Sequence, residues 1–178
     1  MKLINIINDI IKDKGYISVS NFINLALYHP TLGYYQKKNP FGMGGDFITA
    51  PQISSLFNEM ISLFYIYQFK KNFNNQEKIY FIEYGAGNGF FIKDFLKLVK
   101  KVPDFYSRLE VILVEISDNL HKEQAEKLKE FSDVKISWKQ DVISALATIE
   151  DNPEKNLLFI FSNEFFDAFP INQYIKHE

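Results

Sequence analysis

A short stretch near the middle of the chain constrains the fold more than any other. Residues 79–82 are four consecutive apolar side chains, a run typical of a parallel strand covered on both faces. Glu83 ends this run, and glycines follow at every second position, at Gly85, Gly87 and Gly89. Apolar side chains then return at helical spacing. Strand, glycine turn and helix in this order predict the opening unit of a nucleotide-type α/β fold.

The three glycines suit a ligand that lies against bare backbone. They permit a sharp turn, and the helix that follows presents free N–H groups and the positive end of its dipole. The dinucleotide fingerprint requires its third glycine one place later, where Phe90 stands. A tight turn without a ligand therefore remains an alternative to a binding loop.

Composition narrows the functional classes. With 178 residues and 47% hydrophobic content, the chain is long enough and apolar enough to fold around a core. A net charge of −2 indicates no preference for nucleic acid. The absence of cysteine excludes disulfides, thiolate metal sites and a cysteine nucleophile. The three histidines lack ligand spacing, so we expect no metal site.

The first residues do not resemble a targeting segment. Asn5 and Asn8 interrupt the apolar run too early for a secretory signal, and the arginines of a transit peptide are missing. No stretch approaches the roughly 20 apolar residues of a membrane span. The expected location is a cytosol, with the mitochondrial matrix as the alternative.

Helices are predicted before the central strand. Apolar spacing predicts an amphipathic helix over residues 2–13, stopped by Gly15, and a second helix that ends near residue 28. Residues 36–50 form a glycine-rich segment interpreted as a binding lid, with Asp46 at a ligand-facing corner and a floppy surface loop as the alternative. One long helix is expected from Pro51 to about residue 71. Its expected buried face is Ile53, Phe57, Met60, Ile61, Phe64, Tyr67 and Gln68.

Three further strands are predicted after the glycine turn, and each ends in polar chemistry. Residues 109–114 lead into Glu115, residues 134–138 are followed by Asp141, and residues 157–161 run into Asn163 and Glu164. The last of these strands is apolar throughout, so we expect both of its faces to be covered. In a parallel sheet these carboxyl ends lie on one side, where ligands bind. Glu115 is spaced to take both hydroxyls of a ribose, with a charged strand end as the alternative.

This constellation resembles a class I S-adenosylmethionine-dependent methyltransferase. Longer motifs carry a closer resemblance to the MidA-like family, the family of the mitochondrial complex I assembly methyltransferase, which dimethylates an arginine of a core complex I subunit. The matching segments are residues 25–35 (LALYHPTLGYY), 45–52 (GDFITAPQ), 83–89 (EYGAGNG), 114–115 (VE) and 163–168 (NEFFDA).

The resemblance implies an α/β fold with a Rossmann-like sheet in strand order 3-2-1-4 and an N-terminal helical extension. It divides the chain into a helical segment with the lid, residues 1–75, and the first half of the cofactor-binding domain, residues 76–178. It also implies S-adenosyl-L-methionine as cofactor and a protein arginine as acceptor, with a complex I subunit as the candidate substrate.

The same resemblance implies roles for the motif residues. Gly85, Gly87 and Gly89 would let the methionine part of the cofactor lie against the backbone, with Glu83 beneath it. The remaining roles are ribose binding by Glu115, adenine binding by Asp141, lid closure by Asp46, and binding of the acceptor by Glu164 with Asn163 and Asp167.

The chain departs from the family pattern in two ways. Ala86 and Asn88 stand where the family commonly carries proline and arginine in the glycine loop. Family members also run to about twice this length, and the part after the fourth strand has no counterpart here. We therefore expect an exposed apolar edge at that strand, self-association through it, and no catalytic activity from these residues alone.

Two readings of other classes stay open. One is an inactive fragment or assembly protein that keeps the fold, and the other is a nicotinamide-binding oxidoreductase. The displaced third glycine argues against the oxidoreductase.

Overall fold

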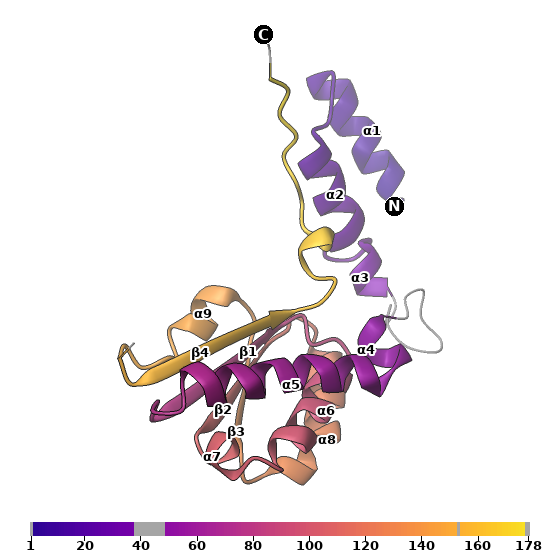
Figure 1. Ribbon diagram of the computed structural model, residues 1–178. Helices are drawn as coiled ribbons and strands as arrows, with labels where there is room; N and C mark the ends of the chain where they lie inside the picture. The colour runs from indigo at the N-terminus through magenta and orange to yellow at the C-terminus, as the bar shows by residue number, and fades with distance from the viewer. Residues whose placement is uncertain (1, 38–48, 153, 177–178) are drawn as a thin grey trace. The chain divides into compact units, whose positions relative to one another are not determined.

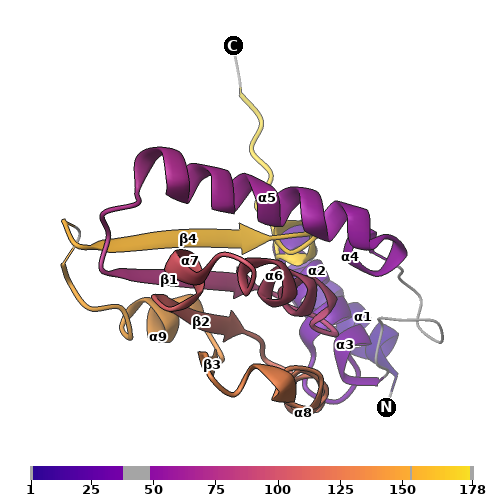
Figure 2. The same cartoon turned by 60° about the horizontal axis from the view of Figure 1, so that its bottom comes forward.

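The computed structural model describes residues 2–37, 49–152 and 154–176 and contains one parallel sheet. Its strand order is β3-β2-β1-β4, which confirms the Rossmann-like arrangement expected from the sequence (Figure 2). Phe81 in the middle of β1 lies opposite Val111 of β2 and Phe159 of β4. The strands are β1 (Lys78–Tyr84), β2 (Leu109–Val114), β3 (Lys135–Lys139) and β4 (Asn156–Ser162).

The described residues fall into two compact units. The smaller holds α1, α2 and α3 together with the segment from Glu164 onward, and the larger holds the sheet with α4 to α9 and ends at Asn163. The division expected between residues 75 and 76 stays a prediction. The helices are α1 (Leu3–Lys14), α2 (Val19–Tyr28), α3 (Tyr34–Lys37), α4 (Ala50–Ile53), α5 (Ser55–Asn72), α6 (Phe90–Val99), α7 (Pro103–Tyr106), α8 (Asp118–Lys127) and α9 (Val142–Leu146), with 3₁₀ turns η1 (Lys129–Phe131) and η2 (Phe166–Ala168).

The helix ends follow local chemistry. Gly15 ends α1 with a left-handed φ of 78°, as expected from the sequence. The side chain of Ser18 accepts from the N–H of Asn21 and so caps α2. The side chain of Ser117 caps α8 in the same way by accepting from Leu120. These caps satisfy N–H groups that have no partner inside the helix.

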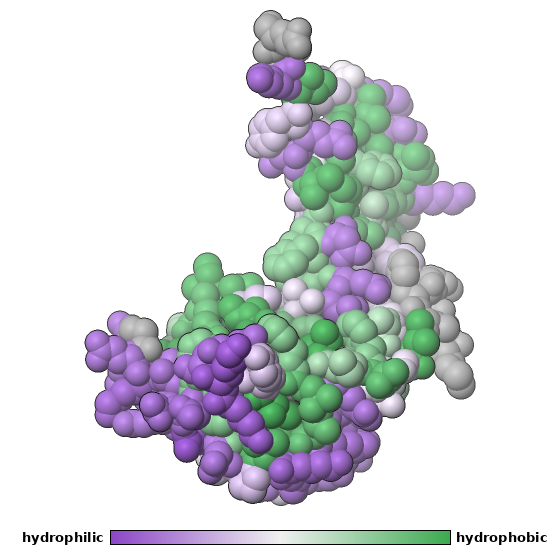
Figure 3. Space-filling model, viewed as in Figure 1, coloured by the Kyte–Doolittle hydropathy of each residue, from purple (hydrophilic) through white to green (hydrophobic). Residues whose placement is uncertain are grey.

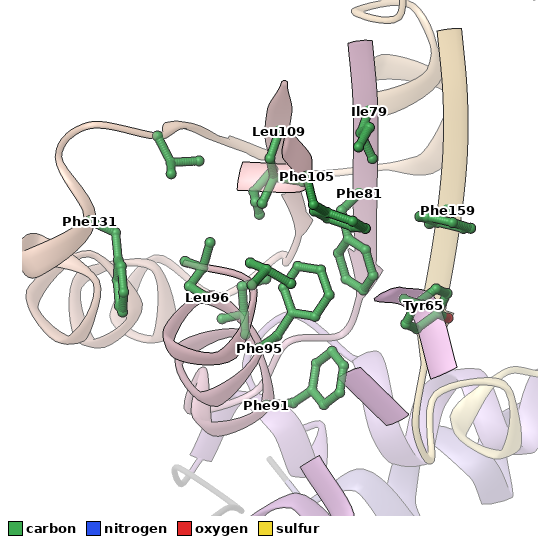
Figure 4. Packing of buried hydrophobic residues seen from close by; sticks show 14 of the residues in the cluster. Tyr65, Ile79, Phe81, Phe91, Phe95, Leu96, Phe105, Leu109, Phe131 and Phe159 are labelled. Carbon is green, nitrogen blue, oxygen red and sulfur yellow. The ribbon is translucent and has the colours of Figure 1, made fainter. Parts of the chain in front are cut away.

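An aromatic core fills one face of the sheet, between the strands and the layer of α5, α6, α7 and α8 (Figures 1 and 4). Phe81 of β1 lies at its centre, with ring centroids 4.2 Å from Phe95 of α6 and 5.1 Å from Tyr65 of α5. Phe159 of β4 joins the same cluster at 4.9 Å from Tyr65. Buried rings of this size supply most of the hydrophobic stabilisation of a domain, so this face holds the larger unit together.

The opposite face of the sheet is covered less completely. There α9 packs against β2 and β3, and the hydroxyl of Tyr80 accepts from the N–H of Glu150 (Figure 1). On β4, Leu158 and Ile160 point to this side and are 38% and 45% exposed.

The expectation that β4 is covered on both faces is therefore wrong. On that face α9 is only five residues long and packs against β2 and β3, at the edge of the sheet away from β4. Within the described residues, no strand pairs with the outer edge of β4.

The long helix expected from Pro51 is also corrected. Ser54 adopts an extended conformation and its side chain accepts from the N–H of Leu56, so the segment is divided into α4 and α5. The buried residues of α5 are Asn58, Ser62, Tyr65, Ile66 and Phe69.

Most of the apolar face predicted for this helix is turned outward, where Figure 3 shows apolar side chains gathered over α5. The buried side combines apolar core residues in the second half of the helix with a polar network in the first. The Nδ2 of Asn58 donates to the carbonyl of Pro51 at 2.9 Å and to the carboxylate of Asp94 in α6 at 2.8 Å, and Ser62 donates to the carbonyl of Asn58.

Candidate functional site

The turn between β1 and α6 has a conformation that requires glycine. Gly85, Gly87 and Gly89 have φ of 67°, 51° and 72°, the left-handed region that other residues rarely adopt. The N–H of Gly85 donates to the carbonyl of Val114 in β2, and the N–H of Gly89 donates back to Ala86. The alternation of glycines in the sequence is thus the alternation of left-handed residues in the turn.

Two of these glycines face different surroundings. A Cβ placed on Gly87 would meet nothing within 4 Å, so the backbone here borders open space. A Cβ on Gly89 would come within 3.2 Å of Cγ of Gln124 in α8. Gly87 is therefore the point where a ligand can approach bare main chain, and Gly89 is the point where the turn packs on a helix.

Glu83 is a buried acid at the end of β1. Its side chain is 4% exposed, and one carboxyl oxygen has no hydrogen-bond partner. Burial raises the pKa of Glu83 to about 8, and the charge of Glu115 adds to the rise. Burial also raises the pKa of Tyr65 to about 12, and the charge of Glu83 adds to this rise. A buried polar atom without a partner is uncommon in folded proteins and is a reason to look for a ligand.

Glu115 at the end of β2 lies beside the same turn. One of its carboxyl oxygens accepts from the N–H groups of Ile116 and Ser117 at 3.0 and 3.1 Å. Burial raises the pKa of Glu115, whereas hydrogen bonds from the N–H groups of Ser117, Ile116 and Gly87 oppose the rise. The structure thus brings together Glu83, Glu115 and the glycine turn, as their positions at neighbouring strand ends predicted.

Asp141 is exposed and caps a helix. Its carboxylate accepts from the N–H of Ser144 at 2.8 Å and from the hydroxyl of Ser144 at 2.9 Å at the start of α9. These bonds lower the pKa of Asp141. Contact with an adenine amino group, which the resemblance implies for Asp141, stays a prediction.

The residues expected to bind the acceptor belong to both units. Asn163 closes the larger unit, and Glu164 and Asp167 lie in the smaller. Glu164 has a left-handed φ of 49°, a strained conformation for a residue with a long side chain. Asp46 falls in residues 38–48, outside the described part of the chain.

Within the smaller unit, two motifs that are distant in the sequence meet. The hydroxyl of Tyr28 donates to the carbonyl of Ala168 at 2.9 Å. Burial raises the pKa values of Tyr28 and Tyr35, and the nearby charge of Asp167 adds to both. The tyrosines of residues 25–35 therefore lie beside the segment expected to bind the acceptor, a contact that sequence reasoning missed although both segments had been noted.

Sequence reasoning also missed the polar contacts that hold the turn from outside, although two of the residues stand in the motifs noted above. Gln52 of α4 donates to the side chain of Asn88 at 3.2 Å, and Asn88 donates to Glu123 of α8 at 2.7 Å. Gln124 of α8 donates to the carbonyl of Gly87. No periodic signal identifies them, because Gln124 stands in a helix rich in lysine and glutamate that has the pattern of a surface helix.

The remaining features of the described residues give no stronger candidate for a binding site than this turn. A hollow of about 380 Å³ lies at the amino end of β4, lined in part by Leu158 and Leu146, and not at the strand ends that carry the acids. The described segments contain no group of His, Cys, Asp and Glu that could hold a metal ion. Within them, no helix has the length and apolar character to cross a membrane.

Comparison with known proteins gives matches along most of the chain. Residues 60–178 match the family described as "Putative S-adenosyl-L-methionine-dependent methyltransferase". The mitochondrial protein arginine methyltransferase NDUFAF7 of Danio rerio is 30% identical over 177 residues, covering 92% of this chain and 42% of that protein. The human protein of the same name is 28% identical over 187 residues, covering 93% and 40%. The chain thus spans about two fifths of the length of the curated relatives it matches.

Solved structures match the fold. A Burkholderia thailandensis protein crystallised with S-adenosyl-homocysteine aligns with a TM-score of 0.61 at 22% identity, over 79% of this chain and 37% of that one. A native crystal structure of a protein of the same superfamily and organism aligns with a TM-score of 0.65 at 20% identity, over 96% of this chain and 40% of that one. At these identities the likeness supports the fold alone.

Proposed function

Because the chain belongs to the family of S-adenosyl-L-methionine-dependent methyltransferases, we propose that it binds this cofactor at the glycine turn and contributes to methyl transfer onto a protein arginine. The observation that carries the proposal is the bare backbone at Gly87 beside two buried acids, one of which has an unpaired oxygen. Activity, acceptor and partners are proposals, since the chain covers about two fifths of its relatives.

The residues around the turn fit this cofactor. The left-handed glycines leave main chain open to the methionine part, and the unpaired oxygen of Glu83 can accept from an ammonium group. Glu115 supplies a carboxylate that can accept from two ribose hydroxyls. We propose Asp141 for the adenine amino group and Asp46 for a lid over the bound cofactor.

When bound, the cofactor supplies an electrophilic methyl group, and the work of the chain is to hold and orient the reactants. We assign the acceptor to Glu164, Asn163 and Asp167. Carboxylates bind a guanidinium group through paired hydrogen bonds, and Glu164 could also accept the proton that leaves the attacking nitrogen. The strained φ of Glu164 supports a functional role, since such strain clusters at active sites.

The cofactor site is tested by a substitution at Gly87. Gly87→Val would fill the open space, but a β-branched residue at φ of 51° would strain the turn even without a ligand. Gly87→Asn tolerates this conformation better and still places a side chain in the open space. We expect folded protein whose affinity for S-adenosyl-homocysteine, measured by calorimetry, falls at least about a hundredfold.

The matched control is Gly15→Asn. Gly15 is also left-handed with open space around its Cβ position, but it ends α1, so the affinity should stay unchanged. Unchanged affinity in folded Gly87→Asn would contradict the proposed site. Stabilisation by NADH and not by S-adenosylmethionine in a thermal shift assay would instead favour a nicotinamide-binding protein.

The acceptor role is tested separately. Glu164→Gln in a catalytically competent protein should retain cofactor affinity and lose methyl transfer to an arginine peptide. A fall in cofactor affinity with turnover preserved would show that the residue serves the cofactor instead.

The substrate class and the cellular role are proposed from the relatives and from the family resemblance. The relatives are named as mitochondrial protein arginine methyltransferases, which supports a protein substrate for this chain. We propose the complex I assembly role that the family resemblance implies, whereas the cytoplasmic location expected from the sequence stays a prediction.

We also propose self-association through the edge of β4. Unpaired strand edges with exposed apolar residues tend to pair with other chains. Sedimentation should show oligomers that Ile160→Lys dissociates, and a monomer in the unsubstituted protein would overturn this proposal.

A further inference from the structure

Gln124 is a fully buried amide in a helix whose other side chains are mostly charged. Its Nε2 donates to the carbonyl of Gly87 at 2.6 Å, and its Oε1 accepts from the indole Nε1 of Trp138 in β3 at 2.8 Å. The side chain therefore links the glycine turn to β3. Since 0% of Gln124 is exposed, water cannot replace either bond without opening the site.

The two partners determine both the residue type and its orientation. An indole N–H can only donate, and a backbone carbonyl can only accept. An amide with one donor end and one acceptor end satisfies both groups at once. Glutamate would direct an acceptor at the Gly87 carbonyl, and an apolar side chain would leave both partners unpaired.

Helix α8 holds three successive residues of the turn. Gln124 donates to the carbonyl of Gly87. The side chain of Asn88 donates to Glu123, and its carbonyl accepts from Lys127. A Cβ added to Gly89 would lie 3.2 Å from Cγ of Gln124. Because a peptide group is planar and trans, anchoring the Gly87 carbonyl toward α8 turns the N–H of Asn88 away from α8. An N–H that points away from α8 can donate to a ligand that lies against the turn.

We propose that Gln124 is a positioning residue for cofactor binding, which sets the orientation of the Gly87–Asn88 peptide and is itself oriented by Trp138. This inference rests on the proposed binding of S-adenosyl-L-methionine at the turn. It adds two residues outside the glycine motif to the determinants of affinity, and it gives α8 and β3 a direct influence on the site.

The experiment compares Gln124→Met, Trp138→Phe and the double variant. Methionine has a similar length and fills the buried space without hydrogen bonds. The control is Gln68→Met, which removes a side-chain hydrogen bond to Asn72 on α5. Two readouts are taken, the affinity for S-adenosyl-homocysteine by calorimetry and the hydrogen exchange of the Gly89 amide, which is bonded to Ala86 inside the turn.

We expect Gln124→Met to weaken the affinity about tenfold and to speed Gly89 exchange about tenfold relative to the amide of Phe81 in the central strand. Trp138→Phe should have a smaller effect in the same direction. It should have no further effect on either readout in the Gln124→Met background, because it acts through Gln124. Gln68→Met should change neither readout.

A purely structural role predicts a different result. Gln124→Met would then lower the free energy of unfolding and speed both amides equally, with unchanged affinity in the folded protein, and the inference would be wrong. If the effects of the two substitutions were additive, Trp138 would not act through Gln124, and that part of the inference would be wrong. If the unsubstituted protein fails to bind S-adenosyl-homocysteine, the proposed function falls, and the ratio of the two exchange rates still decides whether Gln124 orders the turn.

Discussion

Helices α5 and α6 lie against the same face of the sheet, yet the buried residues of α6 are all apolar, whereas those of α5 are polar in its first half and apolar in its second. α6 buries apolar residues, with Phe95 fully inside the core. α5 turns Asn58 and Ser62 inward along its first half and leaves Phe64 54% exposed. Its outward apolar residues, all between 48% and 63% exposed, are Leu56, Met60, Leu63, Phe64 and Tyr67.

The difference teaches that apolar spacing and buried face need not coincide. α6 follows β1 through a tight turn, so its rotation is set by the backbone and its apolar side falls on the sheet. α5 is oriented by hydrogen bonds, since Asn58 ties α4 and α6 together. A buried amide donor without its acceptors would be costly, so the polar network and the buried rings of the second half together favour this rotation over one that buries the outward apolar residues.

The largest effect should come from α6. Phe95→Ala removes a fully buried ring that stacks 4.2 Å from Phe81, and we expect a loss of about 3–5 kcal/mol in the free energy of unfolding measured with urea. The matched substitution on α5 is Phe64→Ala, which should lose less than about 1 kcal/mol. Equal losses in the two variants would show that Phe64 is as buried as Phe95, against the difference between the two helices.

Glu83, at the end of β1, should make the free energy of unfolding depend on pH. Its pKa in the folded protein, about 8, lies above the ordinary value of 4.5, so the folded state holds a proton that the unfolded state has lost. The contribution of Glu83 to stability is then largest at low pH and falls by about 3 kcal/mol between pH 5.5 and pH 8. Glu83→Gln should lack this part of the slope in urea titrations across that range. A parallel slope in both proteins would refute the assignment.

The polar network of α5 should have a smaller effect. Asn58→Ala removes donors to Pro51 and Asp94, and we expect a loss of about 2 kcal/mol in unfolding free energy. Asn72→Ala on the same helix removes only an exposed bond to Gln68 and should change stability by less than about 0.5 kcal/mol. If the two losses are alike, the network does not orient the helix.

The smallest effect should come from the outward face of α5. Met60→Glu with Phe64→Lys places opposite charges one turn apart on exposed positions, and the free energy of unfolding should stay within about 0.5 kcal/mol of the unsubstituted protein. Circular dichroism during urea titration would measure it. A large loss would show that these side chains are buried in solution.

The sequence was sufficient for features set by local chemistry. The glycine turn and the positions of Glu83 and Glu115 beside it follow from the pattern of strands, glycines and acids, whereas the strand order was implied by the family resemblance. These features could be predicted because parallel strand ends share one side of a sheet. The break at Ser54 could not be predicted, because a serine in a helical pattern is compatible with either a cap or a surface position.

Features set by contacts between distant segments were beyond sequence reasoning. Gln124 has no distinguishing neighbour along the chain, and its role depends on Gly87 and Trp138 from two other elements. The bond from Tyr28 to Ala168 joins positions 140 residues apart. The edge position of β4 was expected, but its partly exposed face was missed, since an apolar run does not reveal whether a helix covers each face of the strand.

The place of β1 in the sheet has a consequence for how the chain acquires its structure during synthesis. β1 pairs with β2 on one edge and with β4 on the other, so residues 78–84 wait for residues 156–162 to emerge from the ribosome. At roughly 5–20 residues per second, that edge stays unpaired for several seconds. Meanwhile the ring of Tyr65 lacks Phe159, and its hydroxyl lacks the carbonyl of Ile160. Until β4 docks, the nascent chain therefore exposes an unpaired apolar strand edge, a surface that makes folding intermediates prone to aggregation.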